Sequence, residues 1–226
     1  EWILAKFYSD RNHEAHYRRV MRLRALTRRL AGKSLTNNVK EGFPIYKQLA
    51  AATKFDSTQT ILDFGCGTAG TGIHFAKAMT TGHYSGVDIS PDALAVARSR
   101  LSKSIELDRY SLNQIADTAE ISNYSDIDII IAQSVFTHNP LDLFETFLNA
   151  GKTALKPTGI IAVSFAVSQT ESRISKTDFI FTREQINATA SKCGYTAQIA
   201  TDWHHPSMEK RSPDAPVDQL FLLKVK

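Results

Sequence analysis

ILDFGCGTAG, residues 61–70, runs from a short apolar strand into three glycines with the spacing G-x-G-x-x-G. A strand that turns abruptly into a helix leaves backbone N–H groups at the helix start, and these groups bind an anion such as a phosphate or a carboxylate. Gly65 and Gly67 allow a tight turn that a ligand can approach, and Gly70 allows the following helix to pack close to the strand. The stretch therefore predicts a nucleotide-like ligand at the end of a strand.

Two carboxylates accompany this glycine loop and narrow the choice of ligand. Asp88 ends the second expected strand in SGVDIS, eighteen residues past Gly70, where a carboxylate can accept hydrogen bonds from both ribose hydroxyls. Asp63 lies two residues before Gly65, a position that is usually apolar in dinucleotide folds. A buried carboxylate repels a pyrophosphate but attracts the ammonium and sulfonium of S-adenosylmethionine. The charge pattern thus favours S-adenosylmethionine over NAD, which the loop and Asp88 alone would also accommodate.

From residue 60 the sequence alternates between strand and helix patterns, which predicts a mostly parallel sheet with helices on both faces. The expected strands are 60–64, 84–89, one within 108–116, 128–132 and 160–167, and the expected helices are 70–79, 90–104, 141–155 and 182–194. Two late strands, 197–201 and 219–225, have no helix between them and therefore predict an antiparallel hairpin at the edge of the sheet.

Two expected helices, 12–31 and 43–53, precede the first strand. Apolar residues recur in each of them at spacings of three and four, as on the buried face of an amphipathic helix. We therefore expect residues 1–55 to form an N-terminal helical cap on a core of residues 56–226. Candidates in this cap to line the pocket beneath it are Tyr8, Tyr17 and Tyr46.

Four stretches carry a resemblance to a known family: ILDFGCGTAG, GVDISPDALAVAR, IDIIIAQSVFTH and LKPTGIIAVSF. They follow one another as in the class I S-adenosylmethionine-dependent methyltransferases, over about residues 58–168. The resemblance implies an α/β fold with a Rossmann-like, seven-stranded, mostly parallel sheet, whose last strand is antiparallel, in a three-layer α/β/α arrangement. LFLLKVK is similar to that last strand, and QSVFTHN and FIFTREQINATASKCGY resemble the small-molecule members of the family.

The resemblance also implies S-adenosyl-L-methionine as the cofactor, with S-adenosyl-L-homocysteine as the product. Asp63 and the loop glycines would lie along the methionine part, Asp88 would hold the ribose, and Ile89 would pack on the adenine. An acidic residue usually meets the adenine amino group in this family; Asp117 is the best candidate, and Asn113 is its rival. The implied cofactor-binding residues are Asp63, Gly65, Cys66, Gly67, Gly70, Asp88, Ile89, Asp117, Thr118 and Gln133.

Methyl transfer is an in-line displacement at a carbon that the sulfonium already activates, so the enzyme chiefly positions the nucleophile and excludes water. A hydroxyl nucleophile also benefits from a general base, and His138 in SVFTHNP, just past the fourth strand, is the catalytic candidate. The alternatives for His138 are to line the pocket or only to pack in a loop. The expected acceptor-binding residues are Tyr8, Tyr17, Tyr46, Phe136, His138 and Asn139. We expect a small-molecule acceptor, methylated on an oxygen of a glycan, a lipid-linked molecule or a secondary metabolite.

The sequence carries a formal net charge of +4, and the basic excess lies in its N-terminal part. Residues 1–40 hold ten Lys or Arg and three Asp or Glu, for a net charge of +7, which leaves −3 for the remainder. Such a basic helix is a solvated face, or it binds an acidic substrate, a carrier protein or RNA. RNA is the less favoured partner, because the arginines lack interleaved aromatics and QSVF stands where base-modifying members carry N/D-P-P-Y/F. An RNA methyltransferase and a non-catalytic S-adenosylmethionine-binding regulatory module are the alternative functions.

The remaining features concern the compartment and metal binding. No apolar run reaches eighteen residues, which argues against a membrane span, and no secretory signal is visible. The two cysteines, Cys66 and Cys193, read as free thiols of a reducing compartment, so we expect a cytoplasmic protein. His204 and His205 are adjacent, and adjacent histidines rarely bind the same metal ion. No third ligand follows them at a spacing typical of metal sites, so no metal site is expected.

Overall fold

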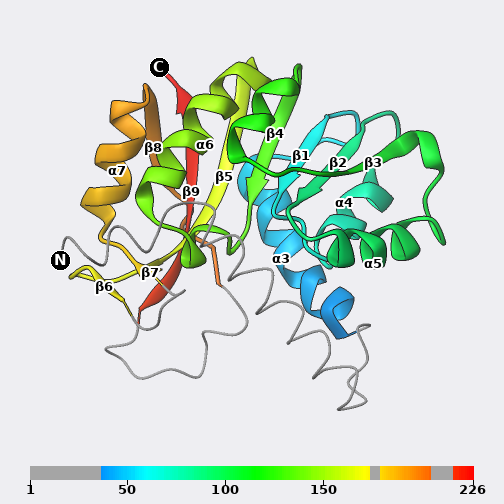
Figure 1. The fold of residues 1–226 in the computed structure, drawn as a ribbon, viewed down its shortest axis with the longest axis horizontal. Helices are drawn as coiled ribbons and strands as arrows, with labels where there is room; N and C mark the ends of the chain where they lie inside the picture. The colour runs from blue at the N-terminus through cyan, green and yellow to red at the C-terminus, as the bar shows by residue number, and fades with distance from the viewer. Residues whose placement is uncertain (1–36, 174–178, 205–215) are drawn as a thin grey trace.

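The structure, a computed structural model, describes residues 37–173, 179–204 and 216–226. Seven strands form one sheet in the order β3-β2-β1-β4-β5-β9-β8, with helices on both of its faces (Figure 1). The strands of this sheet are β1 (Ile61–Phe64), β2 (Tyr84–Asp88), β3 (Tyr110–Gln114), β4 (Ile127–Ala132), β5 (Leu155–Val167), β8 (Tyr195–Ile199) and β9 (Val217–Val225). The helices are α3 (Asn37–Thr53), α4 (Gly72–Ala78), α5 (Pro91–Leu101), α6 (Leu141–Ala154) and α7 (Arg183–Lys192).

The strand directions confirm the expected sheet. β3, β2, β1, β4 and β5 are parallel neighbours, whereas β9 runs antiparallel to both β5 and β8. β9 and β8 therefore form the expected hairpin at the sheet edge, with β9 as the antiparallel last strand. Both strands begin two residues earlier than expected, because Tyr195 still pairs with Val225 and Val217 with Val167.

β1 and β4 lie side by side near the middle of the sheet, and their sequences show why. β1 (ILDF) is buried at every position, and β4 (IDIIIA) at every position except Asp128. Successive residues of a strand point to opposite faces, so a strand covered by helices on both sides needs an almost continuous apolar sequence. One core packs α6 and α7 on one face, and a second packs α3, α4 and α5 on the other. These two cores make the expected three-layer α/β/α arrangement.

Local capping signals set two of the helix starts. At α5, the Ser90 hydroxyl accepts a hydrogen bond from the Ala93 N–H at 3.3 Å, and Pro91 is the first helical residue. At α7, Thr182 and Gln185 exchange the two hydrogen bonds of a capping box. Both starts lie where the sequence predicts them.

Some boundaries differ from the prediction. α3 begins at Asn37 rather than near residue 43, and it continues through Pro44. The sequence misses this start because the first turns of the helix are polar and carry no apolar stripe. β5 begins at Leu155, and an irregularity in its pairing with β4 absorbs the turn expected at 156–159. The short hairpin of β6 (Ser172–Arg173) and β7 (Phe179–Ile180) is not predicted, since two-residue strands show no periodicity. The helix expected at 12–31 lies outside the described residues, as do Tyr8 and Tyr17.

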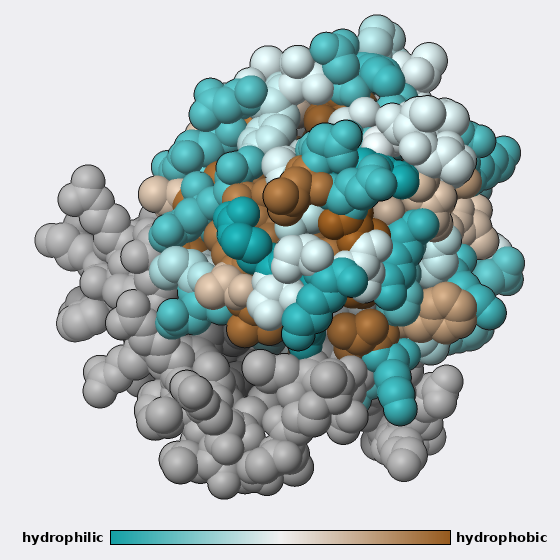
Figure 2. Space-filling view, turned by 90° about the vertical axis from the view of Figure 1, so that its right-hand side faces the viewer, coloured by the Kyte–Doolittle hydropathy of each residue, from teal (hydrophilic) through white to brown (hydrophobic). Residues whose placement is uncertain are grey.

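The surface on the side of β3 and α5 carries hydrophobic residues in small groups separated by hydrophilic ones (Figure 2). Leu107, just before β3, is 76% exposed and is one of three large apolar side chains that are exposed among the described residues. Scattered apolar residues of this kind are normal on soluble domains and do not mark a docking site. No helix in the described ranges is long and apolar enough to cross a bilayer.

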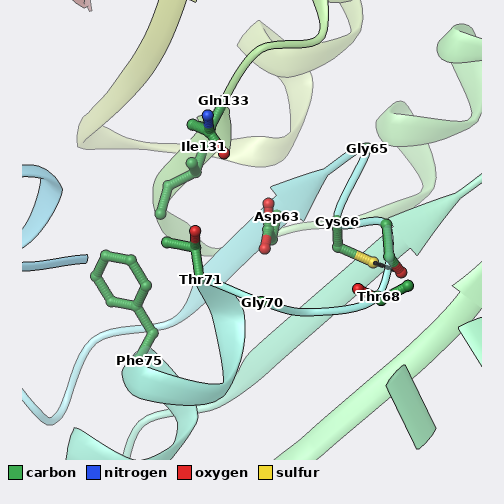
Figure 3. A pocket seen from close by; sticks show the side chains of 10 residues that line it. Asp63, Gly65, Cys66, Thr68, Gly70, Thr71, Phe75, Ile131 and Gln133 are labelled. Atoms are coloured by element: carbon green, nitrogen blue, oxygen red, sulfur yellow. Dashed lines mark hydrogen bonds between the residues drawn. The ribbon is translucent and has the colours of Figure 1, made fainter. Parts of the chain in front are cut away.

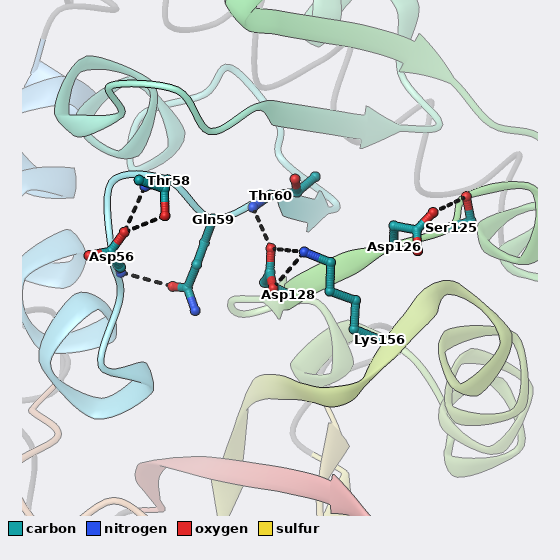
Figure 4. A network of polar contacts seen from close by, with 8 residues as sticks. All are labelled: Asp56, Thr58, Gln59, Thr60, Ser125, Asp126, Asp128 and Lys156. Carbon is teal, nitrogen blue, oxygen red and sulfur yellow. Dashed lines mark hydrogen bonds and ion pairs between the residues drawn. The ribbon is translucent and has the colours of Figure 1, made fainter.

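A polar network fastens the amino-terminal ends of the central strands (Figure 4). Asp128 at the start of β4 accepts hydrogen bonds from the Lys156 ammonium at 2.8 and 2.9 Å, and from the Thr60 N–H at 2.9 Å. The carboxylate thus joins the starts of β1, β4 and β5 at the end of the sheet opposite the glycine loop.

Replacing Asp128 with alanine should lower the free energy of unfolding by about 1–3 kcal/mol, because the partly buried Thr60 N–H and Lys156 ammonium lose their acceptor. Urea unfolding measured by circular dichroism tests this. Asp108→Ala, at an exposed position before β3, is the control and should change stability by less than about 0.5 kcal/mol. Equal effects of the two changes would contradict the role of the network.

Candidate active site

A cavity opens at the carboxyl ends of β1 and β4, where the chain leaves the sheet in opposite directions. From β1 it proceeds through α4 to β2 on one side, and from β4 through α6 to β5 on the other. Ligands of open α/β sheets bind at such a topological switch point. The cavity has a volume of about 120 Å³ (Figure 3). The lining residues are Asp63, Gly65, Cys66, Gly67, Thr68, Gly70, Thr71, Phe75, Ile131 and Gln133.

The glycine loop between β1 and α4 has a backbone conformation that favours glycine. Gly65 has a φ of +71° and Gly67 a φ of +54°, both in the left-handed region. A Cβ atom at Gly67 would find no other atom within 4 Å, so the backbone here faces open space. The loop can therefore accept a ligand against its main chain, as the motif predicts.

Asp88, the last residue of β2, ties this loop to the turn before α5. Its Oδ2 accepts a hydrogen bond from the Gly67 N–H at 2.9 Å, and its Oδ1 accepts one from the Ser90 N–H at 2.8 Å. Burial raises the pKa of the Asp88 carboxyl, and these backbone donors oppose the rise. A carboxylate oxygen has two lone pairs, so both oxygens keep acceptor capacity for ribose hydroxyls. Asp88 does not line the cavity itself; it contacts Gly67, which does.

Asp63, the third residue of β1, is buried and faces the cavity (Figure 3). Its Oδ2 accepts a hydrogen bond from the Tyr84 hydroxyl at 2.6 Å. Burial raises the pKa of Asp63 to about 6; the Tyr84 hydrogen bond lowers it, and the Asp88 charge raises it. At neutral pH the wall of the cavity therefore carries a negative charge.

No lysine or arginine of the described ranges forms an ion pair with Asp63. A buried anion without a counter-ion is costly, so a ligand that brings a positive charge is favoured and a diphosphate is disfavoured. The site thus fits S-adenosylmethionine: Asp63 in the cavity would hold its ammonium, and Asp88, which contacts the cavity residue Gly67, would hold its ribose. This charge argument disfavours the NAD alternative.

Three other expected cofactor residues, Cys66, Gly70 and Gln133, also line the cavity. Burial raises the pKa of the free Cys66 thiol well above its usual range, so the side chain is a neutral part of the wall rather than a nucleophile. The carbonyl of Gly70 lies against Gly42 of α3, where a Cβ atom would not fit. Helix α3 therefore packs directly on the glycine loop.

The residues expected at the adenine end do not line this cavity. Ile89 is partly buried against the core, and Thr118 is buried. Asp117 is exposed and caps the short helix η2 (Thr118–Asn123) by accepting a hydrogen bond from a backbone N–H. Its rival Asn113 donates to the Tyr124 hydroxyl at 3.1 Å. The adenine contacts of these residues stay predictions.

The turn after β4, residues 133–139, is held by hydrogen bonds on both sides of His138. The Ser134 N–H donates to the Ser164 hydroxyl at 2.8 Å, which supports the φ of +56° at Ser134. The Asn139 amide donates to the Val135 carbonyl at 2.8 Å. His138 ends the short helix η3 (Phe136–His138) and is half-buried, outside the lining of the cavity. Catalysis by His138 and acceptor contact by Asn139 stay predictions.

Of the two aromatic residues in the described ranges that were expected to contact the acceptor, Phe136 is buried, and the acceptor contact of the partly buried Tyr46 stays a prediction. Phe136 has no exposed surface, because it packs among other phenylalanines of the core. The structure therefore assigns Phe136 to the core in place of the expected acceptor contact. Tyr46 on α3 meets the edge of Phe75, with 4.8 Å between ring centroids, and Phe75 lines the cavity. Tyr46 thus supports a cavity residue.

The sequence candidates omit four lining residues: Thr68, Thr71, Phe75 and Ile131. Ile131 is two residues before Gln133 and pairs in register with Asp63. Because side chains alternate between the two faces of a strand, Ile131 could have been predicted to lie on the same face as Gln133. Phe75 lies four residues after Thr71, on the same side of the start of α4. Nothing in the sequence separates these two from other residues of an amphipathic helix.

A family model described as a methyltransferase domain matches residues 55–211. The chain belongs to this methyltransferase family. The matched range contains the glycine loop, Asp63, Asp88 and the turn after β4, so the family assignment and the cavity concern the same part of the molecule. The cofactor of this methyltransferase is S-adenosylmethionine, as the resemblance and the charge of the cavity both predict.

Two curated proteins show the range of relatives of this methyltransferase. The ribosomal protein L11 methyltransferase of Burkholderia thailandensis is 33% identical over 106 residues, which is 47% of this chain and 31% of that enzyme. The uncharacterized protein MJ0906 of Methanocaldococcus jannaschii is 32% identical over 111 residues, 49% of this chain and 29% of that protein. The chain therefore spans less than a third of the length of these two relatives.

Similar solved structures support the fold of the methyltransferase. The glycopeptide N-methyltransferase MtfA complexed with sinefungin has a TM-score of 0.61 and 14% identity, covering 80% of this chain and 85% of that one. The mitomycin 7-O-methyltransferase MmcR has a TM-score of 0.60 and 17% identity, covering 83% and 54%. The [4+2]-cyclase SpnF has a TM-score of 0.65 and 17% identity, covering 80% and 81%. Because the identities are low, these likenesses concern the fold alone.

Replacing Asp88 with alanine should weaken S-adenosylhomocysteine binding by about 1.5–3 kcal/mol, because it removes charge-assisted hydrogen bonds to the ribose and frees the Gly67 N–H. Isothermal titration calorimetry measures this loss, with Asp108→Ala as an exposed control that should bind normally. An unchanged affinity of the Asp88 variant would rule out its ribose role.

Proposed function

We propose that this methyltransferase methylates an oxygen of a small-molecule acceptor, such as a glycan, a lipid-linked molecule or a secondary metabolite. The observation that supports S-adenosylmethionine as the methyl donor is Asp63, a buried carboxylate beside the glycine loop that forms no ion pair with a lysine or arginine of the described ranges. S-Adenosylmethionine, when bound here, would supply the methyl group from its sulfonium. The residues of the turn after β4 support the proposal of a small, hydroxylated acceptor.

Phe136 argues for a small acceptor over a nucleic-acid base. Enzymes that act on a base take it out of the stack and hold it against aromatic or apolar side chains. Phe136 is the aromatic residue of this turn, and it is wholly buried in the core, so it offers no ring to a flipped base. The half-buried neighbours around it carry amide, hydroxyl and imidazole groups, which suit a polar, hydroxylated acceptor.

His138 is the proposed general base. The turn that carries it follows β4, at the same end of the sheet as the cavity, and is braced at Ser134 and Asn139. The residues of the chain would hold the acceptor hydroxyl in line with the methyl group and exclude water. An imidazole nitrogen of His138 would take the hydroxyl proton as the oxygen–carbon bond forms and the carbon–sulfur bond breaks, with S-adenosylhomocysteine as the leaving group.

A screen of acceptors for S-adenosylhomocysteine release tests the proposed function. The panel contains sugars, lipid-linked saccharides and hydroxylated aromatic metabolites, together with RNA and ribosomal proteins. We expect release with a small hydroxylated acceptor and none with the Asp63→Asn variant. Release only with RNA or protein would overturn the acceptor assignment. Donor binding without release from any member would favour the regulatory module.

A protein acceptor is the second candidate, because a relative of this chain is a ribosomal protein L11 methyltransferase.

An RNA acceptor would involve the basic residues of the N-terminal part, and Arg18, Arg22 and Arg29 lie outside the described residues. RNA binding that depends strongly on salt and is lost when these three arginines become alanine would favour an RNA acceptor.

We place the enzyme in the cytoplasm, in keeping with its two free thiols, Cys66 and Cys193.

A further inference from the structure

Tyr84, the first residue of β2, is fully buried, and its hydroxyl makes the 2.6 Å hydrogen bond to Asp63. β1 and β2 are parallel neighbours in which Asp63 stands opposite Gly86. Tyr84 is two residues before Gly86, so its side chain is on the same face of the sheet as that of Asp63. A tyrosine side chain is long enough to reach diagonally across to the neighbouring strand.

Gly72, the first residue of α4, makes room for this hydroxyl. A Cβ atom at Gly72 would overlap the hydroxyl oxygen of Tyr84 and contact its ring. The start of α4 therefore packs directly against the hydroxyl end of the tyrosine ring. The three residues Asp63, Gly72 and Tyr84 form one packed unit behind the glycine loop.

We propose that Tyr84 is a positioning residue for the methyl donor, whose hydroxyl fixes the Asp63 carboxylate so that Oδ1 receives the ammonium of the aminoacyl group. The inference rests on the proposed donor role of Asp63. Among the described residues Tyr84 is the hydrogen-bond partner of this carboxylate, bound at Oδ2, which leaves Oδ1 without a protein donor there. A neutral hydroxyl orients the carboxylate without cancelling its charge, as an arginine or lysine at the same place would do.

The surroundings of Asp63 make this support necessary. Asp88 and the Cys66 thiol face Asp63 from the end of β2 and from the glycine loop, and the Asp88 charge opposes ionisation of Asp63. The hydrogen bond from Tyr84 is the contact that favours the ionised form. Removing this hydroxyl should raise the pKa of Asp63 further and leave the carboxylate free to change its orientation.

Tyr84→Phe removes the hydroxyl and keeps the ring. We expect calorimetry at pH 7 to show S-adenosylhomocysteine binding weakened about tenfold, as for the loss of a hydrogen bond to a charged group. The pH below which binding declines should also move upward. 5′-Methylthioadenosine, which lacks the aminoacyl group, should bind to the variant within about twofold of the wild type, because it makes no contact with Asp63.

Tyr195→Phe is the matched control. Tyr195 is another buried tyrosine of the sheet, and its hydroxyl donates to the Leu148 carbonyl at 2.9 Å on the face covered by α6. This variant should lose stability much as Tyr84→Phe does, yet bind S-adenosylhomocysteine normally at every pH. A double-mutant cycle provides the second readout: Tyr84→Phe should add no further loss of affinity in the Asp63→Asn background.

Unchanged S-adenosylhomocysteine binding by Tyr84→Phe would overturn the proposal, and so would an equal loss for both ligands or an additive cycle. If Tyr84→Phe does not fold, 3-fluorotyrosine at position 84 provides an alternative test, in which fluorine NMR reports whether the aminoacyl group of the ligand affects this ring. Its resonance should shift with S-adenosylhomocysteine much more than with 5′-methylthioadenosine, and equal shifts would overturn the proposal. If the wild type binds neither ligand, the donor role itself fails, which is a different result.

Discussion

Asp63→Asn is expected to bind S-adenosylhomocysteine about 3–5 kcal/mol more weakly than the wild type and yet to be the more stable protein at pH 8. Asparagine keeps the shape of the side chain and an oxygen that can accept the Tyr84 hydrogen bond. It carries no charge to offset the ammonium of the ligand, and its own NH₂ group would meet that ammonium. The loss of affinity is therefore larger than for Asp88→Ala.

The gain in stability follows from the pKa of Asp63, which is about 6 in the folded protein against 3.8 without perturbation. Between these values the folded state binds more protons than the unfolded state, so the free energy of unfolding falls as the pH rises through this window. Above pH 6 the ionised carboxylate destabilises the fold by about 3 kcal/mol, since one pKa unit corresponds to about 1.4 kcal/mol. Asparagine avoids most of this cost, and we expect about 1–3 kcal/mol of added stability at pH 8.

Denaturant unfolding of both proteins at pH 8 and at pH 4 measures this difference, which should disappear at the lower pH. Burial likewise raises the pKa of Asp218 to about 6, against a hydrogen bond from Trp203 that lowers it. Asp218 therefore gives both proteins the same trend with pH, and only their difference reports on Asp63. A variant that is no more stable at pH 8, or one that still binds the product tightly, would contradict the role of this carboxylate.

His138→Ala should lower kcat about 100-fold or more and leave the affinity for S-adenosylhomocysteine unchanged. The reason is that the imidazole would act on the acceptor proton and lies outside the lining of the cavity. The measurement is kcat across pH with the acceptor found in the screen. A rate that equals the wild-type rate at every pH would refute the base assignment.

His83→Ala is the control for this prediction. His83 precedes β2 at the opposite end of the sheet, where its ring nitrogens contact the Asp108 carbonyl and the Ser111 hydroxyl. Loss of this imidazole should leave kcat and its pH dependence as they are in the wild type. Equal losses of rate in both variants would point to a general effect on the fold.

Part of the cavity lining could be predicted because its signals are local. Asp63, Gly65, Gly67 and Gln133 stand at the ends of two adjacent strands, and the cavity is lined by all four. Once the strand order is inferred, their proximity follows from sequence position alone. The continuous apolar sequence of β4 and the two C-terminal strands β8 and β9 are also local patterns. The sheet could therefore be predicted from the sequence.

The rest depends on tertiary packing. Phe136 was expected to contact the acceptor because it follows β4, but the aromatic residues that pack around it come from β1, α6 and β5. Tyr84 looks like any apolar strand residue, and only the neighbouring strand and the start of α4 reveal its contact with Asp63. The polar first turns of α3 carry no periodic signal, so its true start also escapes prediction.

The close approach of Gly42 in α3 to the Gly70 carbonyl matters to anyone who shortens this protein for crystallisation. A fragment starting at residue 56, the boundary predicted from the sequence, would lack α3 and would leave the glycine loop and the edge of Phe75 exposed to water. Expression trials should therefore retain α3, because a fragment without this helix loses the contacts that cover the glycine loop.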